Sequence, residues 1–226
     1  PAIDLISEGN YASTEEIEEA YNIDTNKPII LFTQHSVTTE FDLATEQLRP
    51  SLSALEQLSL KKDYQIFVTY PNNDAGGRKI IEEINSINNS KIKVFQSLGR
   101  YFYHGVLALS LEDTKNVVCV GNSSSGIKET PAFGCPTVNI GSRQDSRLRG
   151  KNVVDTSYDA KEIMDAINYC IEDKQFRELC KNSENPYGTG DAGIKIANVL
   201  AETEISRNLL KKKMTLLGKR EGDWFS

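Results

Sequence analysis

The stretch NVVCVGNSSSGIKETPAFGCPTVNIGSR, residues 116–143, decides the fold of this 226-residue chain. Its apolar run at residues 117–120 predicts a buried strand, and residues 137–140 predict a second one. Between them lie a polar turn at residues 121–126 and a short helix that ends at Gly134. This order of elements is a βαβ unit, which predicts two parallel strands.

The turn at residues 121–126, GNSSSG, leads from a strand into a helix. The first N–H groups of a helix have no partner within the helix, and the helix dipole favours an anion there. Hydroxyl and amide side chains add donors, and a glycine allows a ligand to approach the backbone. We therefore predict a phosphate site of a nucleotide, formed by Ser123, Ser124, Ser125 and Gly126. The alternative is that the serines and the asparagine only cap the helix.

Three common motifs do not fit this turn. A Walker P-loop requires Lys and then Ser or Thr after its last glycine, whereas Ile127 and Lys128 follow Gly126. The dinucleotide fingerprint G-x-G-x-x-G is absent, and the hydrolase motif G-x-S-x-G lacks its second glycine.

Composition excludes several classes of protein. The net charge of −6 argues against general nucleic-acid binding. The four cysteines have no C-x-x-C spacing, so we expect reduced, buried thiols and neither a disulfide framework nor a zinc site. No apolar run reaches about 18 residues, and no signal-peptide core is present. We expect a soluble cytoplasmic protein with no metal, no cofactor and no contact with nucleic acid or membrane.

Strands alternate with helices along the chain. The predicted strands are residues 29–33, 65–70, 92–95, 117–120, 137–140 and 152–155. This alternation predicts an α/β domain with a doubly wound, Rossmann-like, mostly parallel sheet. Ligands of such sheets bind beyond the carboxyl ends of the strands. Polar clusters follow four predicted strands, at residues 34–35, 72–74, 121–125 and 141–144, so we expect them to converge on one edge.

Three parts of the chain are expected. Residues 1–27 are acidic, contain a capped-helix pattern and predict an inter-domain linker with a short helix. Residues 28–205 form the predicted Rossmann-like domain. Residues 206–226 form a basic helical tail, which we interpret as a solvated face in preference to a nucleic-acid or membrane contact.

Several side chains at the predicted edge suit a phosphate ligand. Arg143 offers a planar fork of donors, although an isolated arginine is often only a surface residue. His35 follows a strand and could donate to a phosphate, act as an acid, or be structural. Glu129 could either stabilise the helix dipole or accept hydrogen bonds from ribose hydroxyls. His104 lies in an apolar helical stretch and is expected to be packed or solvated.

Four motifs together resemble the hydrolysing UDP-N-acetylglucosamine 2-epimerases of bacterial sialic acid biosynthesis. They are QHSVTTE (34–40), YPNNDAGG (70–77), GNSSSGIKETPAFGCPTVNIGSRQ (121–144) and NPYGTGDAG (185–193). The resemblance spans residues 28–205. It implies the C-terminal half of a glycosyltransferase-B-like, two-domain enzyme, with the active cleft between two Rossmann-like domains and UDP held mainly by this one.

The resemblance also implies roles for individual residues. His35 would approach the pyrophosphate as a catalytic residue, and Ser123 and Ser124 would bind phosphate. Glu129 would hold the ribose hydroxyls, and Arg143 would lie at the nucleotide site.

The resemblance implies further positions in the cleft, and one residue departs from the family pattern. Asn72 would line the cleft, and the uracil would lie near Leu98 and Arg100. Ser36 departs from the family pattern, which often has proline after the histidine.

In the family, the acids that abstract the C2 proton belong to the N-terminal domain, which this sequence does not contain. The resemblance implies that the whole enzyme would convert UDP-GlcNAc or a related UDP-sugar to ManNAc or its analogue and UDP. Homo-oligomers of the family are built largely by the other domain. We expect the 226 residues alone to bind UDP and to turn over little or nothing. A glycosyltransferase of the same architecture and a non-catalytic nucleotide-binding module are the two alternatives.

Overall fold

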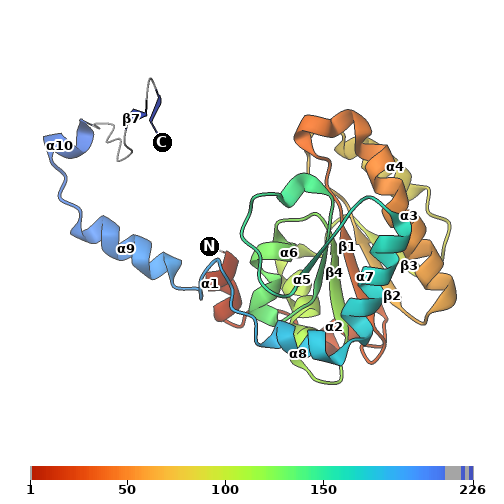
Figure 1. Cartoon of the computed structure of the whole chain (residues 1–226). Coiled ribbons are helices and arrows are strands. Elements are labelled where there is room, and N and C mark those ends of the chain that lie inside the picture. The colour runs from red at the N-terminus through yellow and green to blue at the C-terminus, as the bar shows by residue number, and fades with distance from the viewer. Residues whose placement is uncertain (1, 212–219, 222–223, 226) are drawn as a thin grey trace. The chain divides into compact units, whose positions relative to one another are not determined.

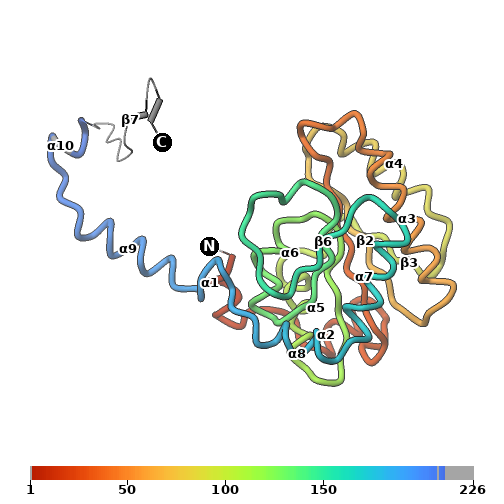
Figure 2. Tube along the Cα trace, in the orientation of Figure 1, coloured from red at the N-terminus to blue at the C-terminus, as the bar shows by residue number. Residues whose placement is uncertain are grey.

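The structure is a computed structural model that describes residues 2–211, 220–221 and 224–225. The chain divides into two compact units, Pro1–Gly190 and Asp191–Ser226. Figure 2 follows the first unit from its N-terminal helix through the sheet to the loop that precedes residue 191. The second unit contains α9 (Ala192–Glu202), α10 (Arg207–Leu210) and the antiparallel pair β7 (Arg220–Glu221) and β8 (Trp224–Phe225).

The first unit is built on a six-stranded sheet in the order β3-β2-β1-β4-β5-β6, and every neighbouring pair is parallel. The strands are β1 (Ile29–Thr33), β2 (Gln65–Thr69), β3 (Ile92–Phe95), β4 (Val117–Gly121), β5 (Thr137–Ile140) and β6 (Val153–Thr156). This order confirms the predicted doubly wound sheet. The chain reverses its direction of winding between β1 and β4, which is where ligands of this architecture bind.

Helices cover both faces of the sheet (Figure 1). One face carries α3 (Ala44–Lys61), α4 (Gly77–Asn85), α7 (Ala160–Glu172) and α8 (Lys174–Lys181), and the other carries α1 (Ala2–Ser7), α2 (Thr14–Tyr21) and α5 (Gly99–Ala108). Strand β1 is continuously apolar because helices cover both of its faces. Ile30 and Phe32 enter the first core, whereas Ile29 and Leu31 enter the second, because successive side chains point to opposite faces.

The first 27 residues contain the capped helix that the sequence predicts. The Ser13 hydroxyl accepts from the Glu16 N–H, and the Glu16 carboxylate accepts from the Ser13 N–H at 2.8 Å. Ile17 of the same helix is fully buried in the second core. The boundaries 1–27, 28–205 and 206–226 stay predictions, and most of the basic tail lies outside the described residues.

We call residues 121–126 the serine turn. The helix that follows it is shorter than the sequence pattern suggests. A single α-helical turn, α6 (Ser125–Lys128), continues into the 3-10 turn η3 (Thr130–Phe133), which Gly134 ends in the left-handed conformation at φ 57°. Pro131 has no N–H to donate to an α-helical bond, which explains the change. Because a helix dipole grows with the number of aligned peptides, the predicted dipole is small here.

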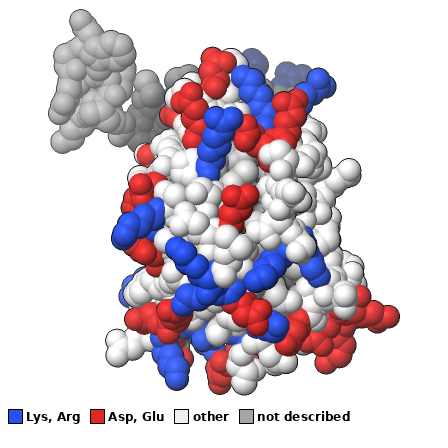
Figure 3. Space-filling view, turned by 90° about the vertical axis from the view of Figure 1, so that its right-hand side faces the viewer, with Lys and Arg blue, Asp and Glu red and all other residues white. Residues whose placement is uncertain are grey.

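Three further 3-10 turns complete the first unit: η1 (Thr38–Leu43), η2 (Leu109–Leu111) and η4 (Ser142–Gln144). On the face presented in Figure 3, acidic and basic side chains are interspersed. Ion pairs also join neighbouring helices, for example Arg49 of α3 with Glu83 of α4 at 2.9 Å. Within the described ranges, no helix has the length and apolar character needed to cross a membrane.

Candidate functional site

A cavity of about 430 Å³ opens at the carboxyl ends of β1, β2 and β4. Six of the ten residues that the sequence analysis selected line it: His35, Leu98, Arg100, Ser123, Ser125 and Glu129. They come from distant parts of the chain and meet because the ends of parallel strands share one edge. Asn72, Ser124 and Gly126 are not among the described residues that line this cavity.

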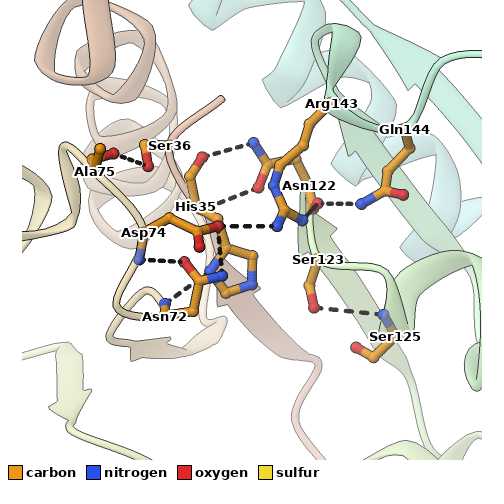
Figure 4. Close-up of polar contacts among 10 residues, drawn as sticks. All are labelled: His35, Ser36, Asn72, Asp74, Ala75, Asn122, Ser123, Ser125, Arg143 and Gln144. Carbon is orange, nitrogen blue, oxygen red and sulfur yellow. Dashed lines mark hydrogen bonds and ion pairs between the residues drawn. The ribbon is translucent and has the colours of Figure 1, made fainter. Parts of the chain in front are cut away.

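Asn122 holds the two central strand ends together (Figure 4). The His35 N–H donates to Asn122 Oδ1 at 2.7 Å, and Asn122 Nδ2 donates to the His35 carbonyl at 2.8 Å. The Asn122 side chain is 1% exposed, so its amide is committed to this bridge. The prediction that this amide is a donor for a ligand is therefore wrong. Asn122 directly follows β4, and His35 lies two residues beyond the end of the neighbouring strand β1.

His35 is held as a neutral imidazole. Its Nδ1 accepts from the Asn72 N–H at 3.0 Å, which places the ring hydrogen on Nε2. Burial, reinforced by the positive charge of Arg143, lowers the pKa of His35 from 6.5 to about 4. At neutral pH the ring therefore offers a ligand one N–H donor and no positive charge.

Arg143 contacts the backbone of the serine turn. Its Nη1 donates to the Asn122 carbonyl at 3.1 Å, and its Nη2 lies 3.5 Å from Asp74 Oδ2. Asp74 also accepts from Asn72 Nδ2 at 2.7 Å (Figure 4). Arg143 and Arg147 line a neighbouring cavity of about 430 Å³, beside η1. Arg143 thus lines the neighbouring cavity and is not among the described residues that line the first one, and its ion pair with Asp74 was not anticipated.

Ser36, the residue that departs from the family pattern, connects two loops. Its hydroxyl donates to the Ala75 carbonyl, which joins the segment after β1 to the segment after β2 (Figure 4). Proline at this position could not form that bond.

The serine turn contains backbone donors that have no partner among the described residues. Within the part of the chain that the structure describes, the N–H groups of Ser123 and Ser124 donate to no protein acceptor. Ser124 is the N-cap of α6 but makes no side-chain cap bond, while Ser123 Oγ accepts from the Ser125 N–H at 3.4 Å. Capping by Ser123 is therefore weak and leaves the backbone donors open to an anion.

Two residues of the turn have structural neighbours. The Ser125 hydroxyl shares a hydrogen bond with the Tyr103 hydroxyl from α5. Gly126 is buried, and a Cβ there would lie 3.0 Å from the Thr137 methyl group. Close packing of α6 on β5 explains this glycine, and its contact with a ligand stays a prediction.

Glu129 has a partner that the sequence analysis did not find. Its Oε2 lies 3.0 Å from His104 Nε2, and the His104 side chain is 3% exposed. The expectation that His104 is packed holds, but the ring also makes this polar contact. At the other end of the cavity, Leu98 is buried at the start of α5, and exposed Arg100 donates to the Asn10 carbonyl at 2.9 Å.

The potential metal ligands among the described residues are dispersed. No group of three or more His, Cys, Asp or Glu side chains is arranged there to hold an ion. The four cysteines are free and buried.

Comparison with known sequences identifies relatives of this chain. The model of the UDP-N-acetylglucosamine 2-epimerase family matches residues 1–201. The UDP-N-acetylglucosamine 2-epimerase of Neisseria meningitidis serogroup B is 36% identical over 168 residues, which cover 74% of this chain and 41% of that protein. A hydrolyzing UDP-N,N'-diacetylbacillosamine 2-epimerase of Legionella pneumophila is 29% identical over 215 residues, which cover 94% and 52%. The chain thus spans about half the length of the curated relatives it matches.

Solved structures share the fold. The UDP-GlcNAc 2-epimerase of Neisseria meningitidis bound to UDP-GlcNAc superposes with a TM-score of 0.69 at 19% identity, covering 89% of this chain and 53% of that one. This neighbour has the glycosyltransferase-B-like fold that the sequence predicted. Since the family model covers nearly the whole described chain, the protein is a member of the UDP-N-acetylglucosamine 2-epimerase family.

Proposed function

We propose that this chain is the UDP-binding part of a hydrolysing UDP-N-acetylglucosamine 2-epimerase. The observation that carries the proposal is the convergence of His35, Ser123 and Glu129 on one cavity at the point where the sheet winding reverses. The family match and the hydrolyzing relative in Legionella support the reaction class. The Neisseria structure is bound to UDP-GlcNAc, which supports a UDP-sugar as the ligand of this chain.

In this proposal the phosphates of UDP occupy the serine turn. The unpaired N–H groups of Ser123 and Ser124 donate to phosphate oxygens, and His35 donates through Nε2. Arg143 exchanges its long contact with Asp74 for a shorter, charge-assisted bond to the ligand. These donors stabilise the negative charge that develops on UDP when its bond to the sugar C1 breaks.

The nucleoside extends along α5. Glu129 accepts hydrogen bonds from the ribose hydroxyls, and the uracil lies near Leu98 and Arg100, which line the other end of the cavity. Water completes the hydrolysis, so that UDP-GlcNAc, or an analogue, gives ManNAc and UDP. We place the groups that remove the C2 proton on a separate N-terminal domain. The 226 residues alone therefore bind UDP and have little or no epimerase activity.

Calorimetry with UDP tests the ligand. We expect Arg143→Ala to weaken binding at least about tenfold, because a hydrogen bond to a charged group contributes roughly 1.5–3 kcal/mol. Arg49→Ala is the matched control, since it removes the same charge from a pair with Glu83 on the helices that cover the sheet. Equal affinity of Arg143→Ala and wild type would refute the phosphate role of Arg143.

Activity measurements separate the alternatives. Robust release of ManNAc from UDP-GlcNAc by these 226 residues would contradict the proposed division of labour. Transfer of the sugar to an acceptor alcohol would favour a glycosyltransferase instead.

A further inference from the structure

Two consecutive residues of α5 contact the two ends of α6. The Tyr103 hydroxyl shares a hydrogen bond with the hydroxyl of Ser125, the first residue of α6. The next side chain, His104, reaches Glu129 at the other end, with 3.0 Å between His104 Nε2 and Glu129 Oε2. The short α6 is therefore held at both ends by one helix.

The His104 ring is fixed in its site. The side chain is 3% exposed, and the ring packs against Phe133 with 5.7 Å between the ring centroids. Its Nδ1 is buried and has no hydrogen-bond partner among the described residues. A hydrogen on Nδ1 would be buried without an acceptor, so the ring carries its hydrogen on Nε2 and donates it to Glu129.

Glu129 is held through one oxygen only. Oε2 accepts from His104, whereas Oε1 makes no hydrogen bond within the described residues. The side chain is 19% exposed and lines the cavity, so Oε1 is available to a ligand. A glutamate that is free to rotate would lose side-chain entropy on binding, and the bond from His104 removes part of that cost beforehand.

We propose that His104 is a positioning residue: its Nε2–H fixes Glu129 so that the free carboxylate oxygen accepts from the vicinal ribose hydroxyls of the bound nucleotide. This inference rests on the proposed UDP site and adds to it the origin of ribose selectivity. Among the described residues that line the cavity, Glu129 is the one carboxylate, and the buried His104 ring contacts it directly through Nε2.

The test compares two probes in calorimetry: UDP, and 2′,3′-dideoxyuridine 5′-diphosphate, which lacks both hydroxyls. Wild type should prefer UDP. His104→Leu should lower UDP affinity roughly tenfold and leave the dideoxy compound unchanged, because only the bond through Glu129 is lost. His104→Gln should retain most of the preference, since its amide nitrogen reaches the position of Nε2. Tyr103→Phe, the matched control on α5, should leave the preference between the two probes intact.

The results distinguish failure of the proposed UDP site from failure of the proposed role of His104. Binding of neither probe by wild type would overturn the proposed UDP site and this inference with it. A wild-type preference that persists in His104→Leu would overturn the role of His104 alone, as would equal weakening of both probes. Should His104→Leu fail to fold, as judged by its thermal transition, His104→Asn replaces it. Its shorter amide cannot reach Glu129, and a preference equal to that of His104→Gln would overturn the inference.

Discussion

The pH dependence of stability should reveal the state of His35. Well above pH 6.5 this imidazole is neutral in the folded and the unfolded chain, so its protonation has no effect on stability there. Between pH 6.5 and about 4, the unfolded chain takes up a proton that the folded site does not accept. Acidification through this range therefore destabilises the fold. The difference of about 2.5 pKa units corresponds to roughly 3 kcal/mol, at about 1.36 kcal/mol per unit.

The assay is urea denaturation of wild type and His35→Asn from pH 7.5 to 4. The asparagine oxygen can still accept from the Asn72 N–H, but it does not titrate. The variant should lose less stability than wild type on acidification, by roughly 3 kcal/mol at the low end of the range. Because the chain has only two histidines, NMR can follow the His35 ring directly. A His35 ring that titrates near pH 6.5, or parallel pH profiles for the two proteins, would refute this reasoning.

Further predictions concern the framework of the site. Asn122→Ala should lower the free energy of unfolding by roughly 2–4 kcal/mol in urea denaturation, because two backbone groups of His35 lose their partners. Gly121→Ala should cost more than ~2 kcal/mol or prevent folding, since φ is 124° and a Cβ would lie 2.0 Å from the Thr33 carbonyl oxygen. Gly9→Ala, with φ 69° and open space around it, should cost only about 1 kcal/mol. The four buried cysteines should resist thiol reagents until the chain unfolds.

The sheet and the place of the site could be predicted from sequence because both depend on local patterns. Strand β1 is continuously apolar since both of its faces are covered, and the polar residues after each strand meet because parallel strands end at one edge. The change from α-helix to a 3-10 turn after α6 was not predicted, although Pro131 cannot continue an α-helix.

The side-chain pairing inside the site could not be predicted in this way. Whether Asn122 faces a ligand or the neighbouring strand depends on how β1 and β4 are paired, which its own neighbours in sequence do not specify. The contact of His104 with Glu129 depends on the rotation and height of α5 against α6. Apolar residues on both sides of His104 made it resemble any other core position of that helix.

The bridge between His35 and Asn122 links residues 87 positions apart in the chain. The sheet edge that carries the candidate site can therefore form only after β1 has paired with β4. Its formation belongs to the slow, non-local part of folding. A nucleotide that binds there selects the fully assembled sheet over every partly folded form, so it should stabilise the first unit as a whole. Hydrogen exchange of the His35 amide should then slow with added UDP to the rate of global opening.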